Sequence, residues 1–135
     1  MECRKKDRER HNKTKTEKGY DRTGMESFLQ EDDSMLCYEK NRNTLTIRLI
    51  GELDHSMAAQ IRAEVDELVS DSKVRRLIFD LIDLHFMDSS GIGLIIGRYK
   101  LMARRGGSVA VSGPGAHIDR IFEMAGLYQL VERLA

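Results

Sequence analysis

The sequence predicts an α/β domain in which helices pack on a mixed central β-sheet. Three observations carry this prediction. From Met35 onward, strand-like and helix-like patterns alternate along the chain. A nearly continuous apolar run at 77–82 is typical of a central strand. Glycines and turn residues separate the segments, as at Gly106-Gly107 and Gly126.

The first half of this domain is expected to hold a hairpin and a helix. Met35–Lys40 and Thr44–Ile50 read as strands joined by a turn at 41–43, with Leu45, Ile47 and Leu49 on one face. Asp54 and Ser56 are both suitable N-cap residues for a helix that runs to about Ser70.

The second half continues the alternation. The apolar run at 77–82 predicts a central strand covered on both faces. Helices are expected from Ser90 to about Arg104 and from His117 to Ala125. A strand at 108–111 lies between these helices, and Leu127–Val131 is expected to form the last strand.

Residues 1–34 differ in composition from the rest of the chain. Positions 1–24 contain only three apolar residues, with nine Lys or Arg against five Asp or Glu. Such a segment buries too little apolar surface to offset its ordering entropy, so we expect a disordered polar leader before a domain at 35–135. A basic arm for nucleic acid or membrane is an alternative, but aromatic residues are not interleaved. A further alternative is that translation begins at Met25 or Met35.

The overall composition argues against several function classes. The whole chain of 135 residues balances 22 Lys and Arg against 22 Asp and Glu, which gives no reason to expect nucleic acid or a membrane as the main partner. Two cysteines make no disulfide framework, and no signal peptide is recognisable, so a cytoplasmic protein is expected. The four histidines show no metal-ligand spacing, and we predict neither metal nor cofactor.

The most informative segment places two hydroxyls at the predicted start of a helix, directly after a buried strand. It comprises Asp88, Ser89, Ser90, Gly91 and Gly93. The unpaired N–H groups and the macrodipole of a helix start favour an anion, so a phosphate on Ser89 would be tolerated there. The glycines are expected to let a partner approach the serine. Simple capping by Asp88 and Ser89 is the alternative.

Several separated motifs resemble the STAS domain of anti-sigma factor antagonists, most closely those of the sporulation sigma-F system. The matching segments are Gly51-Glu52-Leu53-Asp54-His55, Phe86-Met87-Asp88-Ser89-Ser90-Gly91-Ile92-Gly93, Gly97-Arg98-Tyr99-Lys100 and, near the end, Phe122, Met124 and Ala125-Gly126-Leu127.

This resemblance implies a binding protein that is not an enzyme. It implies that Ser89, flanked by Asp88 and Ser90, is phosphorylated, and that Asp54 contacts the anti-sigma factor. In such a system the unphosphorylated antagonist binds an anti-sigma factor that is also an ATP- and magnesium-dependent serine kinase, and the sigma factor is released. A PP2C-type phosphatase restores the serine.

Two other signalling roles stay open at this level. One is a receiver-like domain with a phosphorylated aspartate, for which Asp80, Asp83 and Asp88 are candidates. The other is a STAS domain that serves as a sensor in a stress-signalling complex. A hydrolase built on Ser89 with His55 or His85 is disfavoured because the serine lacks the Gly-x-Ser-x-Gly context.

Overall fold

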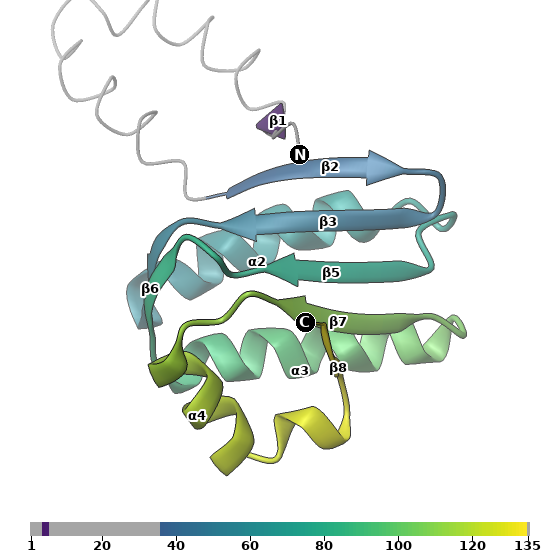
Figure 1. Cartoon of the computed structure of the whole chain (residues 1–135). Helices are drawn as coiled ribbons and strands as arrows, with labels where there is room; N and C mark the ends of the chain where they lie inside the picture. Colours follow the sequence, from purple (N-terminus) through teal and green to yellow (C-terminus); the bar gives the residue numbers. More distant parts are fainter. Residues whose placement is uncertain (1–3, 6–35, 135) are drawn as a thin grey trace, which may run out of the picture.

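A computed structural model of the chain describes Arg4, Lys5 and residues 36–134, and it confirms the predicted α/β class (Figure 1). Its elements follow the chain in this order: β1 (Arg4–Lys5), β2 (Leu36–Asn41), β3 (Thr44–Leu49), β4 (Gly51–Leu53), α2 (His55–Val69), β5 (Arg76–Asp80), β6 (Leu84–Met87), α3 (Ser89–Arg104), β7 (Ser108–Ser112), α4 (Ala116–Met124), the 3-10 turn η1 (Leu127–Gln129) and β8 (Glu132–Leu134).

The main sheet is mixed, as the sequence predicts. Its order is β1-β2-β3-β5-β7-β8, with antiparallel pairing from β1 to β3 and parallel pairing from β3 to β8. The predicted hairpin is present as β2 and β3. β1 adds two residues of the predicted leader to the edge of the sheet, and the remaining leader residues lie outside those described. On β2, Cys37 is buried.

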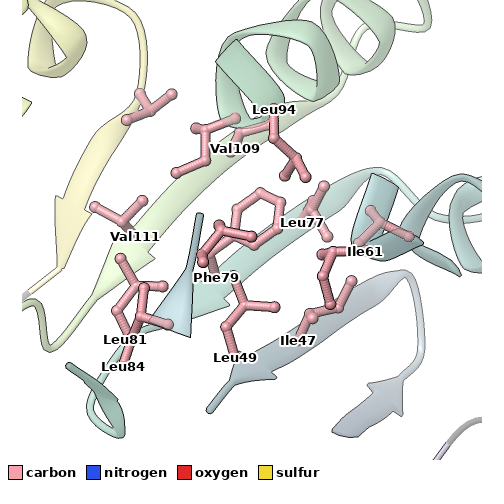
Figure 2. Close-up of a cluster of buried hydrophobic side chains, with 14 of the residues drawn as sticks. Ile47, Leu49, Ile61, Leu77, Phe79, Leu81, Leu84, Leu94, Val109 and Val111 are labelled. Atoms are coloured by element: carbon pink, nitrogen blue, oxygen red, sulfur yellow. The ribbon is translucent and has the colours of Figure 1, made fainter. Parts of the chain in front are cut away.

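One face of the sheet holds the core, and α2 and α3 cover it (Figure 1). The parallel register aligns Ile47 with Phe79, and Phe79 with Val111, across three neighbouring strands, and all three are fully buried. Ile61 from α2 and Leu94 from α3 pack against this layer (Figure 2). On β3 and β5, buried residues alternate with partly exposed ones. This alternation fixes the register of these strands, because a slip of one residue would expose the apolar set.

Two sequence-based expectations about strands are wrong in detail. β5 is central, but it is not covered on both faces: Ile78 is only partly buried and Ile82, just beyond the strand, is 59% exposed. The segment expected to form the last strand begins instead with η1, because Gly126 ends α4 in the left-handed conformation at φ 74°. Leu127 and Val131 are both buried through this turn, and the strand β8 starts one residue later.

The carboxylate of Asp119 links the three C-terminal elements. It accepts hydrogen bonds from the Tyr128 hydroxyl and from Arg133, so that α4, η1 and β8 are joined at one side chain. The Tyr128 bond and then the Arg133 bond lower the pKa of Asp119. Burial, and then the contact with Asp119, raise the pKa of Tyr128 to about 12.

Within the described ranges, no helix is long and apolar enough to cross a membrane.

The contacts of Asp119 with Tyr128 and Arg133 predict that the stability of the protein falls at acidic pH. The depressed pKa means that Asp119 contributes stability above its unfolded-state pKa of about 3.9, and that this stability is lost as pH falls through the lower folded value. Urea unfolding at pH 7, 4 and 3 should therefore show that Asp119→Asn destabilises the protein most at pH 7. A difference between the two proteins that stayed constant over this range would contradict the assignment.

Candidate functional site

A small two-stranded ladder brings the starts of α2 and α3 together. β4 and β6 pair in parallel, with Leu53 opposite Met87. The N–H of Asp88 donates to the carbonyl of Leu53 at 3.3 Å. Asp54 and Asp88 immediately follow the paired residues, so they occupy equivalent positions at the carboxyl ends of neighbouring parallel strands. Each is the N-cap of the helix that follows it.

The Asp88 carboxylate serves both helices at once. Its Oδ1 accepts from the backbone N–H of Ser90 at 2.8 Å, which caps α3. Its Oδ2 accepts from the backbone N–H of His55 at 3.1 Å, in the first turn of α2. The predicted capping role is therefore present, and one side chain ties the two helix starts together. Capping and a role beside a modified serine are compatible.

The two neighbouring serines differ in their surroundings. Ser89 is exposed, and its hydroxyl has no hydrogen-bond partner among the described residues. Ser90 is partly buried, and its hydroxyl lies 3.3 Å from Nδ1 of His55. Ser89 therefore presents a free hydroxyl to solvent at the positive end of a helix of 16 residues. Such a group can accept a phosphoryl group with little change to the fold.

Asp54, the residue before His55, is anionic and partly exposed. Its Oδ1 accepts from the Ser56 hydroxyl at 2.8 Å and from the N–H of Met57 at 3.1 Å. These hydrogen bonds, with Ser56 the larger cause, lower the pKa of the Asp54 carboxyl. The second oxygen makes no hydrogen bond to a described residue, so this carboxylate can cap α2 and still face a cationic group on a partner.

The two predicted site glycines have different surroundings. Gly91 is buried, and a Cβ placed there would lie 2.4 Å from Cγ of Met87. Gly93 is exposed, and a Cβ there would meet nothing within 4 Å. Gly91 thus has an internal packing role under the helix start. Only Gly93 has the open surroundings expected of a residue that leaves space for a partner.

Gly93 faces an open groove between α2 and α3. The groove has a volume of about 440 Å³, and its lining includes His55, Ser90, Gly97 and two arginines of opposite helices, Arg62 and Arg98. An ion pair between Arg98 Nε and Asp66 Oδ1, at 3.1 Å but without hydrogen-bond alignment, joins the two helices beside it.

Alanine substitutions should separate the two glycines. Gly91→Ala must displace the buried Met87 side chain and is expected to lower the free energy of unfolding by about 1–3 kcal/mol. Gly93→Ala meets open space in a helix interior and should raise this free energy by about 0.5–1 kcal/mol. Urea denaturation of both variants beside wild type measures the difference. Equal effects would show that the packing against Met87 is not what constrains position 91.

The aspartates considered as alternative phosphoacceptors have separate roles. Arg48 on β3 forms ion pairs with Asp80 at 2.9 Å and with Asp83 at 3.5 Å. Asp88 instead caps α3.

In the described part of the chain, no three His, Cys, Asp or Glu residues are grouped as metal ligands would be.

Sequence reasoning missed the contribution of His55. The sequence indicates only that this histidine belongs to no metal-ligand pattern and is disfavoured as a hydrolase base. The structure places it between the two predicted site aspartates, with its backbone on Asp88 and its ring on Ser90. No periodicity reveals this contact, because it depends on the pairing of β4 with β6.

Comparison with known proteins identifies the family of the domain. Residues 36–135 match the STAS domain family. The anti-sigma F factor antagonist of Paenibacillus polymyxa is 39% identical over 93 residues, which cover 69% of this chain and 80% of that protein.

Solved structures of the anti-sigma factor antagonist SpoIIAA are also similar, at 33% identity. Its unphosphorylated form matches with a TM-score of 0.66 over 74% of this chain and 88% of the other. The phosphorylated form, described as a Bacillus cell fate determinant, matches with a TM-score of 0.61 over 74% and 91%. The chain belongs to the STAS domain family and is one of its anti-sigma factor antagonists.

Proposed function

We propose that this protein is a partner-switching antagonist of the sigma-F type, controlled by phosphorylation of Ser89. Its unphosphorylated form binds an anti-sigma factor with serine kinase activity in the cytoplasm, and the sigma factor for sporulation genes is released. The kinase uses ATP and magnesium to phosphorylate Ser89, and a PP2C-type phosphatase reverses the reaction. The protein itself acts as a binding module and a substrate, not as an enzyme.

The free, exposed hydroxyl of Ser89 at the start of α3 is the observation that carries this proposal. A phosphate there adds about −1.5 to −2 charges beside the carboxylate of Asp88. The helix start contributes only about 0.3–1 kcal/mol toward an anion, so the fold gains or loses little. A partner surface that fits a neutral hydroxyl would have to bury this charge without compensation, which costs far more.

Structures of a related protein support the proposal that phosphorylation changes surface charge and not the fold. The similar protein SpoIIAA has been solved in an unphosphorylated and in a phosphorylated form, and both resemble this chain at comparable TM-scores. Similar folds for the two forms are what a switch based on surface charge requires. A switch based on refolding would require two different folds.

Asp54 is proposed as a second docking contact, and its capping role can be separated experimentally. Asparagine caps helices about as well as aspartate, so Asp54→Asn should keep the stability of α2 while removing the charge. If the carboxylate faces a basic residue of the partner, this variant should bind the anti-sigma factor on the order of tenfold more weakly. Isothermal titration calorimetry measures the affinity, and thermal unfolding provides the control. Unchanged affinity would restrict Asp54 to capping.

The proposal is tested by incubating the purified protein with its anti-sigma kinase and magnesium ATP. We expect one phosphate per chain, mapped to Ser89 by mass spectrometry and stable to acid. Ser89→Ala should take up none at that position. A phosphate that hydroxylamine removes would identify an acyl phosphate on an aspartate, and it would support the receiver-like alternative instead.

A further inference from the structure

Two hydroxyls lie side by side at the start of α3, yet only one of them makes a hydrogen bond to a residue that the structure describes. Serine hydroxyls are chemically equivalent, so composition alone does not explain why a kinase would choose one. The structure distinguishes them: the Ser90 hydroxyl lies 3.3 Å from Nδ1 of His55, whereas the Ser89 hydroxyl makes no hydrogen bond to residues 36–134. The difference therefore depends on the first residue of α2, the helix that follows the neighbouring strand β4.

We propose that His55 is a specificity-determining residue of the switch, which directs phosphorylation to Ser89 by holding the hydroxyl of Ser90. This inference rests on the proposed function, since it concerns the same kinase reaction. It assigns His55 a positioning role: the imidazole acts on the neighbouring hydroxyl and takes no part in the chemistry at Ser89.

Neighbouring groups hold His55 in its position. It is the first residue of α2, directly after the N-cap Asp54, and its own N–H donates to Asp88 Oδ2 at 3.1 Å. The same carboxylate holds the N–H of Ser90 at 2.8 Å through its other oxygen. Ser90 is thus held at its backbone by Asp88 and at its side chain by His55. Both contacts restrain Ser90, the serine that we propose is not phosphorylated.

The contact restrains Ser90 in either tautomer of the neutral ring. Nδ1 accepts the hydroxyl proton when the ring proton is on Nε2, and it donates to the hydroxyl oxygen when the proton is on Nδ1. In both cases Ser90 Oγ must break this hydrogen bond before it can turn toward a phosphate donor. Among the described residues, Ser89 Oγ has no such contact to break.

The reaction requires a freely oriented oxygen. The serine Oγ attacks the γ-phosphorus of ATP, a new O–P bond forms, and the bond from that phosphorus to the bridging oxygen of ADP breaks. The hydroxyl proton passes to a base of the kinase. Because the attacking and leaving oxygens must lie roughly in line, a hydroxyl already committed to another partner is the poorer acceptor.

Three variants test the inference in the full chain. His55→Ala removes the contact, His55→Phe removes it while keeping a ring of similar size, and His55→Asn keeps a hydrogen-bonding group near the position of Nδ1. His117→Ala is the matched control, because that histidine is also exposed but lies on α4. Each protein is incubated with the anti-sigma kinase and magnesium ATP, and mass spectrometry measures the ratio of phosphate on Ser90 to phosphate on Ser89.

Wild type, His117→Ala and His55→Asn should carry phosphate on Ser89 almost alone. Loss of one hydrogen bond in His55→Ala and His55→Phe should raise the Ser90 to Ser89 ratio about two- to twelvefold. In a Ser89→Ala background, the same two changes should increase phosphorylation of Ser90 by a similar factor. A general loss of structure would slow both serines and would not shift this ratio.

A ratio that is the same in His55→Phe and wild type would overturn the inference while leaving phosphorylation of Ser89 intact. An absence of phosphate from both serines of the wild-type protein would instead overturn the proposed function. The two failures are therefore distinguishable in one experiment.

Discussion

Replacing Ser89 with glutamate is expected to weaken binding to the anti-sigma factor at least about 30-fold, or roughly 2 kcal/mol. Ser89 is exposed at the start of α3, so the new carboxylate can be accommodated within the domain. It would, however, follow the carboxylate of Asp88 directly, on the surface that we propose docks in the neutral form. An added anion must then be desolvated on binding without a group to pair with it.

Ser89→Ala is the matched variant for this prediction. It removes the phosphorylation site but adds no charge, and because the hydroxyl has no partner among the described residues, its affinity should stay within about threefold of wild type. Calorimetric titration of both variants against the anti-sigma factor measures the two affinities. If alanine and glutamate were bound equally well, exclusion by charge would be the wrong explanation.

The largest effect on stability is expected for Phe79→Ala. Phe79 is fully buried on the central strand β5, between Ile47 and Val111 in the core layer (Figure 2). Removing the ring loses buried apolar contact and leaves a cavity, which should lower the free energy of unfolding by about 3–5 kcal/mol. For a domain of this size such a loss is a large share of the total stability. Urea denaturation monitored by circular dichroism measures it.

Ile78→Ala provides the comparison on the same strand. Ile78 lies on the opposite face of β5 and is only partly buried, so its truncation should cost less, about 1–2 kcal/mol. A cost for Ile78→Ala equal to that for Phe79→Ala would mean that both faces of β5 are covered, as the apolar run alone had suggested.

The sequence predicts the fold well where a local pattern decides the structure. Alternating Leu45, Ile47 and Leu49 form the buried face of β3. Asp54 and Asp88 have side chains that satisfy the first N–H groups of a helix, and both are observed as N-caps. These features depend on neighbours within a few residues along the chain, so they can be predicted without tertiary information.

Features that depend on distant pairing could not be predicted in this way. β4 and β6 contain three and four residues, which is too short for a distinctive period, and they are stabilised by pairing with each other. This pairing is what places His55 on Asp88 and Ser90. The error in the last strand has a different cause: Leu127 and Val131, four residues apart, would share one face in a strand as well as in a helical turn, so their spacing does not distinguish the two.

The site itself was therefore only partly predictable. Ser89, Ser90 and Asp88 were identified from one continuous segment, and Asp54 from the family resemblance. The packing reason for Gly91 required the position of Met87, and the engagement of Ser90 required the position of His55. The sequence motif locates the two serines, while the arrangement of the two helix starts determines which of their hydroxyls contacts His55.

The most direct test of the switch uses the natural modification. The complex of the sigma factor with its anti-sigma kinase is titrated with this protein, either unmodified or stoichiometrically phosphorylated at Ser89, and the released sigma factor is measured. The unmodified protein is expected to release the sigma factor, and the phosphorylated protein should release almost none at the same concentration. Equal release by the two forms would contradict the claim that a charge on this one hydroxyl controls docking.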